Sequence, residues 1–162
     1  SGGGTQGGIH FGMASEGKTV YVPMNDMKDT HDGKVWLNRK PGMHSLNSEN
    51  GEILWSSITD KECKEININC DPGISAAVTA IPGAVIAGHL DGMLRVYDKE
   101  NGEILWSFNS LGNYESISGT PASGGSFSGS GPSIRNGYMA INSGYGLYNH
   151  MPGNALLLFS IE

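Results

Sequence analysis

Short apolar segments separated by turn-forming dipeptides recur along the chain. The clearest example is "ISAAVTAI" at 74–81, which is followed by Pro82-Gly83 and then by "AVIAGHLDG" at 84–92. Runs of this length that are rich in β-branched residues and bounded by Gly or Pro are typical of β-strands. The same alternation appears in "GGIHFGMAS" and "KTVYVPM" near the start of the chain. The pattern predicts antiparallel strands joined by tight turns.

An exact internal repeat organises these strands. The octapeptide "ENGEILWS" occurs at residues 49–56 and again at 100–107. Asn-Gly, at Asn50-Gly51 and Asn101-Gly102, favours φ > 0 at both central positions of a hairpin turn. Each copy therefore predicts a strand, a turn and a strand that ends in Trp. A repeat period of 40–50 residues indicates a propeller or a solenoid.

Counting the strands gives two complete units and one incomplete unit. The predicted fold is all-β, with four-stranded antiparallel blades at about 7–58, 73–109 and 124–162, of which the last lacks its outer strand. A β-propeller closes with roughly 4–8 blades, so three cannot form a ring. We therefore expect the chain to be the C-terminal piece of a longer propeller. The alternative is a half-ring in which two copies associate through exposed sheet edges.

Composition narrows the range of partners. The chain has 16 acidic and 10 basic residues, a formal net charge of -6, and no basic run, which argues against binding to nucleic acid. No apolar segment is long enough to span a membrane. The 25 glycines disfavour helices, because Gly destabilises a helix interior. The N-terminal "SGGGTQGG" has no signal-peptide features.

The repeat resembles a known family. "DGMLRVYDKENGEILW" at 91–106 is similar to the repeat of PQQ-type propellers, and "GMHSLNSENGEILW" at 42–55 matches it with Asn47 in place of Asp. "GISAAVTAIPGAVIAGHLDG" and "MPGNALLLFSIE" resemble the C-terminal blades of bacterial polyvinyl-alcohol-dehydrogenase-like quinoproteins. The resemblance covers nearly the whole chain, and the blade motif is more specific for fold than for activity.

This resemblance implies a function only for the complete ring. The cofactors would be PQQ and calcium, the substrate a small-molecule or polymeric alcohol, and the location periplasmic or secreted. The catalytic residues stay unknown, and the isolated chain is expected to be inactive and to bind no cofactor. Its partners would be the remaining blades or a second copy. The alternative is a propeller without enzymatic activity that serves as a scaffold for protein partners.

The resemblance also assigns structural roles. The Trp that follows each turn would pack between neighbouring blades, and the turn glycines would shape the hairpin; these residues are Trp55, Trp106, Gly51 and Gly102. Function in propellers usually lies at the channel rim, where the innermost strands start. The channel-facing candidates for cofactor binding are His10, Phe11, Ser75, Ser126 and Ser128. The loops after the second strand of each blade add Asn25, Asp26, His89, Asp91, Ser143 and Tyr145.

Three further stretches leave alternatives open. "NDMKDTHDG" at 25–33 carries three Asp residues but lacks the EF-hand pattern, which favours a solvated insertion over a calcium site. The glycine- and serine-rich run at 123–131 lacks a phosphate-loop ending, and close backbone packing explains it better. Cys63 and Cys70 form either a local disulfide or two separate thiols, since spacing alone cannot show that their Cβ atoms meet. No metal site is predicted within the chain.

Overall fold

The computed structural model describes residues 8–26, 39–59 and 71–161. Its strands form three sheets and one separate hairpin. The first sheet has the order β1-β2-β3-β4, at Ala14–Glu16, Thr19–Met24, Gly42–Asn47 and Ile53–Ile58. The second has the order β5-β6-β7-β8, at Thr79–Ile81, Ala84–Gly88, Met93–Asp98 and Ile104–Asn109. The third has the order β11-β12-β13, at Ser133–Arg135, Tyr138–Ser143 and Ala155–Ser160.

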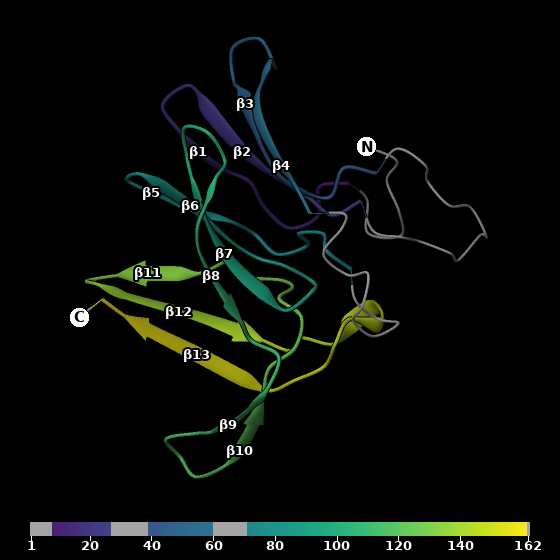
Figure 1. Cartoon of the computed structure of the whole chain (residues 1–162), viewed down its shortest axis with the longest axis vertical. Coiled ribbons are helices and arrows are strands. Elements are labelled where there is room, and N and C mark those ends of the chain that lie inside the picture. The colour runs from purple at the N-terminus through teal and green to yellow at the C-terminus, as the bar shows by residue number, and fades with distance from the viewer. Residues whose placement is uncertain (1–7, 27–38, 60–70, 162) are drawn as a thin grey trace, which may run out of the picture.

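The predicted fold is confirmed. Figure 1 shows the sheets arranged side by side like a fan, as blades of a propeller are. Among the residues that the structure describes, the third sheet has three strands and no counterpart of the outer strands β4 and β8 of the other two sheets. The described residues include one short 3-10 helix, η1 at Leu147–Asn149, and no helix that is long and apolar enough to cross a membrane.

Strand alternation builds two separate cores between the sheets. Neighbouring residues of β6 point to opposite faces of the second sheet. Val85 belongs to the cluster that also holds Tyr21 and Trp55 of the first sheet. Ile86 belongs to the cluster that holds Phe127 and the third-sheet strand residue Ile141. The second sheet is therefore covered on both faces, which explains why every residue of β6 is buried.

The two repeat turns differ from the expected geometry. Only the glycines have positive φ, 74° at Gly51 and 76° at Gly102, so Asn50 and Asn101 do not. Instead, each Asn accepts a hydrogen bond through its side-chain oxygen from the backbone N–H two residues later, at 2.9 Å and 2.8 Å. This hydrogen bond makes an Asx turn, which closes the hairpin without a positive φ at Asn. The two-residue turn occurs elsewhere, at Asn136-Gly137, where both residues have positive φ.

A hairpin that the sequence analysis does not predict follows the second sheet. It consists of β9 at Asn113–Glu115 and β10 at Pro121–Ser123, and it pairs with no strand of the three sheets. Its sequence, "NYESISGTPAS", is polar and has no repeat counterpart. In Figure 1 it stands apart from the fan, next to the start of β13.

Candidate functional site

The starts of the innermost segments and the ends of the second strands meet at one rim of the fan. Leu90 N–H donates to the Gly73 carbonyl at 2.9 Å, and Gly144 N–H donates to the Ser126 carbonyl at 2.8 Å. A second bond links neighbouring sheets, because Phe127 N–H donates to the His89 carbonyl at 3.0 Å. These recurring bonds hold the predicted channel-facing residues and the predicted loop residues at the same end of the molecule. We call this end the rim.

His10 is the one partly exposed histidine among the predicted rim candidates. Its Nδ1 lies 2.8 Å from the hydroxyl of Ser75, which is fully buried. The ring of Phe11 lies 4.2 Å from the His10 ring, and Phe11 itself is half exposed. The structure therefore brings three of the five predicted cofactor-binding residues together. Their role in binding stays a prediction.

His150 is a rim residue that sequence reasoning missed. It follows η1 and is buried, and burial together with the positive charge of His10 lowers its pKa to about 4. It is therefore neutral at pH 7, and its ring lies 6.3 Å from that of Tyr148. Tyr148 has φ 54° and ψ 39°, a left-handed conformation that is uncommon outside glycine. The aromatic content of "YGLYNH" was the only signal in the sequence.

Ser126 and Ser128 have structural contacts instead of open hydroxyls. The Ser126 hydroxyl donates to the Leu90 carbonyl at 2.5 Å and accepts the Met151 N–H at 2.9 Å. The Ser128 hydroxyl donates to the Tyr145 carbonyl at 2.9 Å. Both serines are buried, so their hydroxyls have lost hydrogen bonds to water, and these bonds to the backbone take their place. Their predicted binding role is not tested by this arrangement.

Two further loop candidates, Asp91 and His89, are held in a buried network. Asp91 forms a bidentate ion pair with Arg95, with N–O distances of 3.2 Å and 2.7 Å. His89 accepts a bond from Tyr97 at 2.7 Å if its other ring nitrogen donates to the Pro72 carbonyl at 2.9 Å. Burial, and then the charge of Arg95, keep the pKa of His89 well below its ordinary value. His89 is therefore a neutral histidine with a structural role.

Asp26 occupies the corresponding position in the first sheet. One of its carboxylate oxygens accepts the Lys40 N–H at 3.0 Å, as Asp91 accepts the Met93 N–H at 2.9 Å. Nearby, Asp71 accepts the Gly73 N–H at 3.0 Å. Most of the possible calcium stretch 25–33, and the pair Cys63 and Cys70, lie outside the described residues. Within the described ranges, no three His, Cys, Asp or Glu side chains cluster as metal ligands would.

The two repeat tryptophans lie in different surroundings. Trp55 is 8% exposed, and its indole N–H donates to the Lys99 carbonyl at 2.9 Å. Its ring lies against Gly102, where an added Cβ would approach the ring to 2.5 Å. Trp106 is 41% exposed. It borders an apolar cavity of about 440 Å³ between the second and third sheets, together with Ile134 and Phe159.

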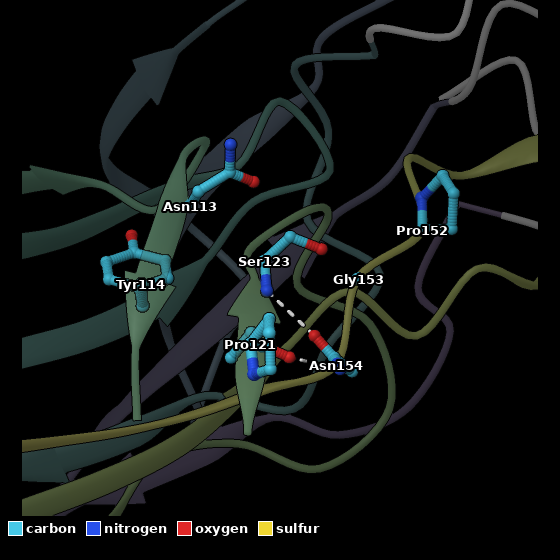
Figure 2. Close-up of a pocket in the computed structure, with 8 residues that line it drawn as sticks. Asn113, Tyr114, Pro121, Ser123, Pro152, Gly153 and Asn154 are labelled. Atoms are coloured by element: carbon cyan, nitrogen blue, oxygen red, sulfur yellow. Dashed lines mark hydrogen bonds between the residues drawn. The ribbon is translucent and has the colours of Figure 1, made fainter. Parts of the chain in front are cut away.

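A cavity of about 490 Å³ lies at the base of the β9–β10 hairpin. Figure 2 shows Asn154, just before β13, linked to Ser123 and Pro121 of β10. The Asn154 side-chain oxygen accepts the Ser123 N–H at 2.7 Å, and its amide donates to the Pro121 carbonyl at 3.3 Å. Asn113 and Tyr114 of β9 line the opposite wall. Nothing in the sequence pattern indicated this cavity, because it depends on the unpredicted hairpin.

Comparisons with known proteins support the resemblance. The chain is 36% identical over 166 residues to a polyvinylalcohol dehydrogenase from Pseudomonas sp, and 32% identical over 168 residues to one from Sphingopyxis sp. (strain 113P3). Each match covers 96% of this chain and 25% of the relative, so the chain spans about a quarter of their length. No protein-family model matches the chain. The predicted similarity to polyvinyl-alcohol-dehydrogenase-like proteins is therefore confirmed.

Solved structures bear on the fold alone. BamB from Moraxella catarrhalis aligns with 91% of this chain and 32% of its own, at a TM-score of 0.55 and 16% identity. The alignment with the quinohemoprotein alcohol dehydrogenase ADHIIG from Pseudomonas putida HK5 covers 82% of this chain and 16% of that protein. Its TM-score is 0.54 and the sequence identity is 19%. One of these proteins is named as a dehydrogenase and the other is not, so the fold does not decide the activity.

Proposed function

We propose that this chain supplies three consecutive blades, at about 7–58, 73–109 and 124–162, to a longer PQQ-dependent alcohol dehydrogenase of the polyvinyl-alcohol-dehydrogenase type. The observation that carries the proposal is the 36% identity to a polyvinylalcohol dehydrogenase over 96% of the chain. Because that match covers a quarter of the relative, the activity belongs to the complete ring. The substrate would be a small-molecule or polymeric alcohol, and the location periplasmic or secreted.

The exposed outer faces of the first and third sheets support a longer ring. Ile9, Phe11 and Met13 are each about half exposed and alternate along the innermost segment of the first sheet. Leu156 and Leu158 of β13 are 76% and 67% exposed on the third sheet. Apolar residues repeated on one face of a strand normally pack against another sheet. Neighbouring blades on both sides would cover them.

The described residues form only part of a cofactor site. His10 and the half-exposed ring of Phe11 offer a hydrogen-bonding and a stacking surface at the rim. Asp91 is already engaged by Arg95, and the described residues present no three-ligand cluster for calcium. PQQ and calcium would therefore have to take most of their contacts from other blades, and no reaction step is assigned to this chain.

The proposal is tested by grafting. Residues 1–162 would replace the matching segment of the Pseudomonas sp polyvinylalcohol dehydrogenase, and dye reduction by an alcohol would be measured with PQQ and calcium. We expect the chimera to retain activity, and the ungrafted 162-residue chain to show none. A chimera that folds, with β-sheet circular dichroism and a cooperative melt, yet cannot oxidise alcohol would contradict the proposal and favour the scaffold alternative.

A matched variant separates the rim from the blades. His10→Gln in the chimera removes the ring that contacts Ser75 and Phe11 but leaves the inter-sheet cores unchanged. If the rim contributes to cofactor binding, more PQQ should be needed for half-maximal activity, with little change in melting temperature. The control is His44→Gln, because His44 bonds to Ser56 and the Lys40 carbonyl within the first sheet. That variant should change stability and leave the PQQ requirement unaltered.

A further inference from the structure

The dipeptide Asn-Gly occurs three times in the chain, at Asn50-Gly51, Asn101-Gly102 and Asn136-Gly137. In each pair the backbone nitrogen of Gly lies next to the amide carbon of the Asn side chain, and glycine has no Cβ to shield that nitrogen. Attack of the nitrogen on the carbon deamidates the Asn. All three Asn residues are exposed to solvent. Exposure therefore does not distinguish them, and any difference in reactivity has to come from the turns.

The first repeat turn holds both reacting groups in hydrogen bonds. Gly51 N–H donates to the Asn47 carbonyl at 2.8 Å. The side-chain oxygen of Asn50 accepts the Glu52 N–H at 2.9 Å. Attack on the Asn50 amide would break both bonds, because the Gly nitrogen has to give up its proton and the amide has to rotate toward it. The folded turn therefore protects Asn50.

The second repeat turn is held in the same way and is also packed. Gly102 N–H donates to the Asp98 carbonyl at 2.9 Å, and the Asn101 side-chain oxygen accepts the Glu103 N–H at 2.8 Å. Gly102 is buried against the ring of Trp55, where an added Cβ would lie 2.5 Å from a ring carbon. Movement of this turn would disturb the contact between the first two sheets. Asn101 is therefore protected at least as well as Asn50.

The turn at Asn136-Gly137 lacks these restraints. It joins β11 to β12, and Arg135 and Tyr138 pair on either side of it. The structure shows no hydrogen bond from the Gly137 N–H or from the Asn136 side chain to any described residue. The strand before the turn, β11, has three residues, so few ladder bonds have to open before the turn can rearrange. The nitrogen and the amide carbon are thus less restrained here than in the repeat turns.

The exposure of this turn follows from its place in the blade. The first and second strands of the other two sheets are joined by two-residue turns at 17–18 and 82–83, and all four residues are exposed. An added Cβ at Gly17 or Gly83 would meet no atom within 4 Å. Both of these sheets have four strands, and the fourth strand leaves the turn open. Asn136 occupies the equivalent turn of the third sheet.

We propose that Asn136 is a site of covalent self-modification, at which the folded chain deamidates while Asn50 and Asn101 are preserved. The Gly137 nitrogen loses its proton to hydroxide and forms a bond to Cγ of Asn136. The bond from Cγ to Nδ2 breaks, and Nδ2 takes up a proton and leaves as ammonia. Water then opens the resulting succinimide ring at one of its two bonds from a carbonyl carbon to nitrogen, which gives Asp or isoaspartate. The only co-reactant is water, and no electrons are transferred.

The two products differ in their effect on the third sheet. Asp keeps the length of the backbone and, like Asn, tolerates the left-handed conformation that Asn136 adopts at φ 50°. Isoaspartate adds a methylene to the backbone, so the two-residue turn no longer matches the pairing of Arg135 with Tyr138. Ile134 of β11 packs against the core between the second and third sheets. We therefore expect isoaspartate to loosen β11 and to speed amide hydrogen exchange there.

The experiment ages the 162-residue chain at mildly alkaline pH and follows each Asn-Gly pair by mass spectrometry. Trypsin places the three pairs in different peptides, because Lys or Arg lies between them. Asn136 should convert at least about tenfold faster than Asn50 or Asn101, since each of those has to lose two hydrogen bonds first. In urea, which removes the turns, the three rates should converge. Labelling by an isoaspartate-specific methyltransferase measures the isoaspartate product.

Two variants test the cause of the protection. Asp98→Ala removes a side chain that accepts two backbone N–H groups of the second repeat turn, at 2.7 Å and 3.3 Å. It should raise the rate at Asn101 about fivefold and leave the rate at Asn136 unchanged. The matched variant is Asn47→Ala, which removes the acceptor of one N–H at 2.8 Å in the first repeat turn and should raise the rate at Asn50 alone. Circular dichroism verifies that both variants fold.

Three results would overturn the inference. Equal rates at the three sites in the folded chain would show that the dipeptide alone decides the reactivity. The same holds if Asn136 stays intact in the folded chain under conditions in which the chain in urea reacts at all three sites. An unchanged rate at Asn101 in Asp98→Ala would show that hydrogen bonds do not protect the repeat turns. The measurement needs no PQQ and no alcohol, so its outcome is independent of the grafted chimera.

Discussion

Trp55 and Trp106 stand at the same place in the two copies of the octapeptide "ENGEILWS", yet one is enclosed and the other is open. Trp55 is 8% exposed and donates a hydrogen bond to the carbonyl of Lys99 in the next sheet. Trp106 is 41% exposed and meets Phe108 and Phe159 at ring distances of 6.2 Å and 5.6 Å. The local sequence is identical, so the difference arises from the neighbouring sheet. A four-stranded neighbour encloses the ring, and a three-stranded neighbour does not.

This contrast shows that each copy of the repeat supplies one partner of a contact between neighbouring sheets, the Trp or the turn glycine, and needs a second copy for the other partner. The octapeptide supplies a Trp on one sheet and a turn glycine that receives the Trp of the preceding sheet. Gly102 serves Trp55 in this way, whereas an added Cβ at Gly51 would meet no atom within 4 Å. Each copy is satisfied only when another copy follows or precedes it, as in other repeat proteins whose stability depends on nearest-neighbour interfaces.

The largest expected effect comes from truncating the two tryptophans. Trp55→Ala should lower the free energy of unfolding by about 3–5 kcal/mol, because it leaves a cavity in the core between the first two sheets. Trp106→Ala should cost about 1–2 kcal/mol, because less area is buried there. Urea denaturation followed by far-UV circular dichroism measures both. Equal losses would mean that Trp106 is enclosed in solution.

The glycines that face these rings give a smaller effect. Gly102→Ala places a Cβ against the Trp55 ring and also strains a residue at positive φ, so a loss of about 3 kcal/mol is expected. Gly51→Ala carries only the strain, about 1 kcal/mol. The denaturation midpoints of the two variants measure the difference. If the two losses are the same, the contact between Gly102 and Trp55 contributes nothing to stability.

The pH dependence of stability distinguishes the two buried histidines of the rim, His150 and His89. His150 has a pKa of about 4 in the folded protein, below the ordinary value of 6.5, so the unfolded chain binds more protons between these values. Stability should therefore fall as the pH drops from 6.5 to 4, by about 2 kcal/mol for this residue. His150→Gln should reduce that fall when urea midpoints are compared at pH 7 and 4.5.

The fall should not disappear in the variant. His89, whose pKa also lies well below its ordinary value, contributes a loss of the same sign. His89 is enclosed between Pro72 and Tyr97, whereas His150 follows η1, between β12 and β13, near His10. An unchanged pH dependence in His150→Gln would show that His150 is not neutral in the folded protein at pH 6.

The sequence alone was enough to predict the strands of the blades, but it did not predict several of the contacts at the rim. The alternation of Val85 and Ile86 and the positions of the repeat turns follow from local pattern, although the backbone conformation of Asn50 and Asn101 does not. His150 and Asn154 could not be found this way, because they lie in irregular segments without periodicity. The contacts of His10 with Ser75 and of Asn154 with Ser123 join residues far apart in sequence. No local rule states such a pairing.

The sequence by itself determined the strands of the three sheets, their order within each sheet and the recurrence of the Trp-bearing strand, because these depend on side-chain alternation and turn chemistry within a few residues. The tertiary structure alone decided which Trp is enclosed, where the β9–β10 hairpin stands and which edge stays open. Those features depend on how much surface the adjacent sheet covers. That coverage is a property of neighbours in space, so two identical octapeptides acquire different surroundings.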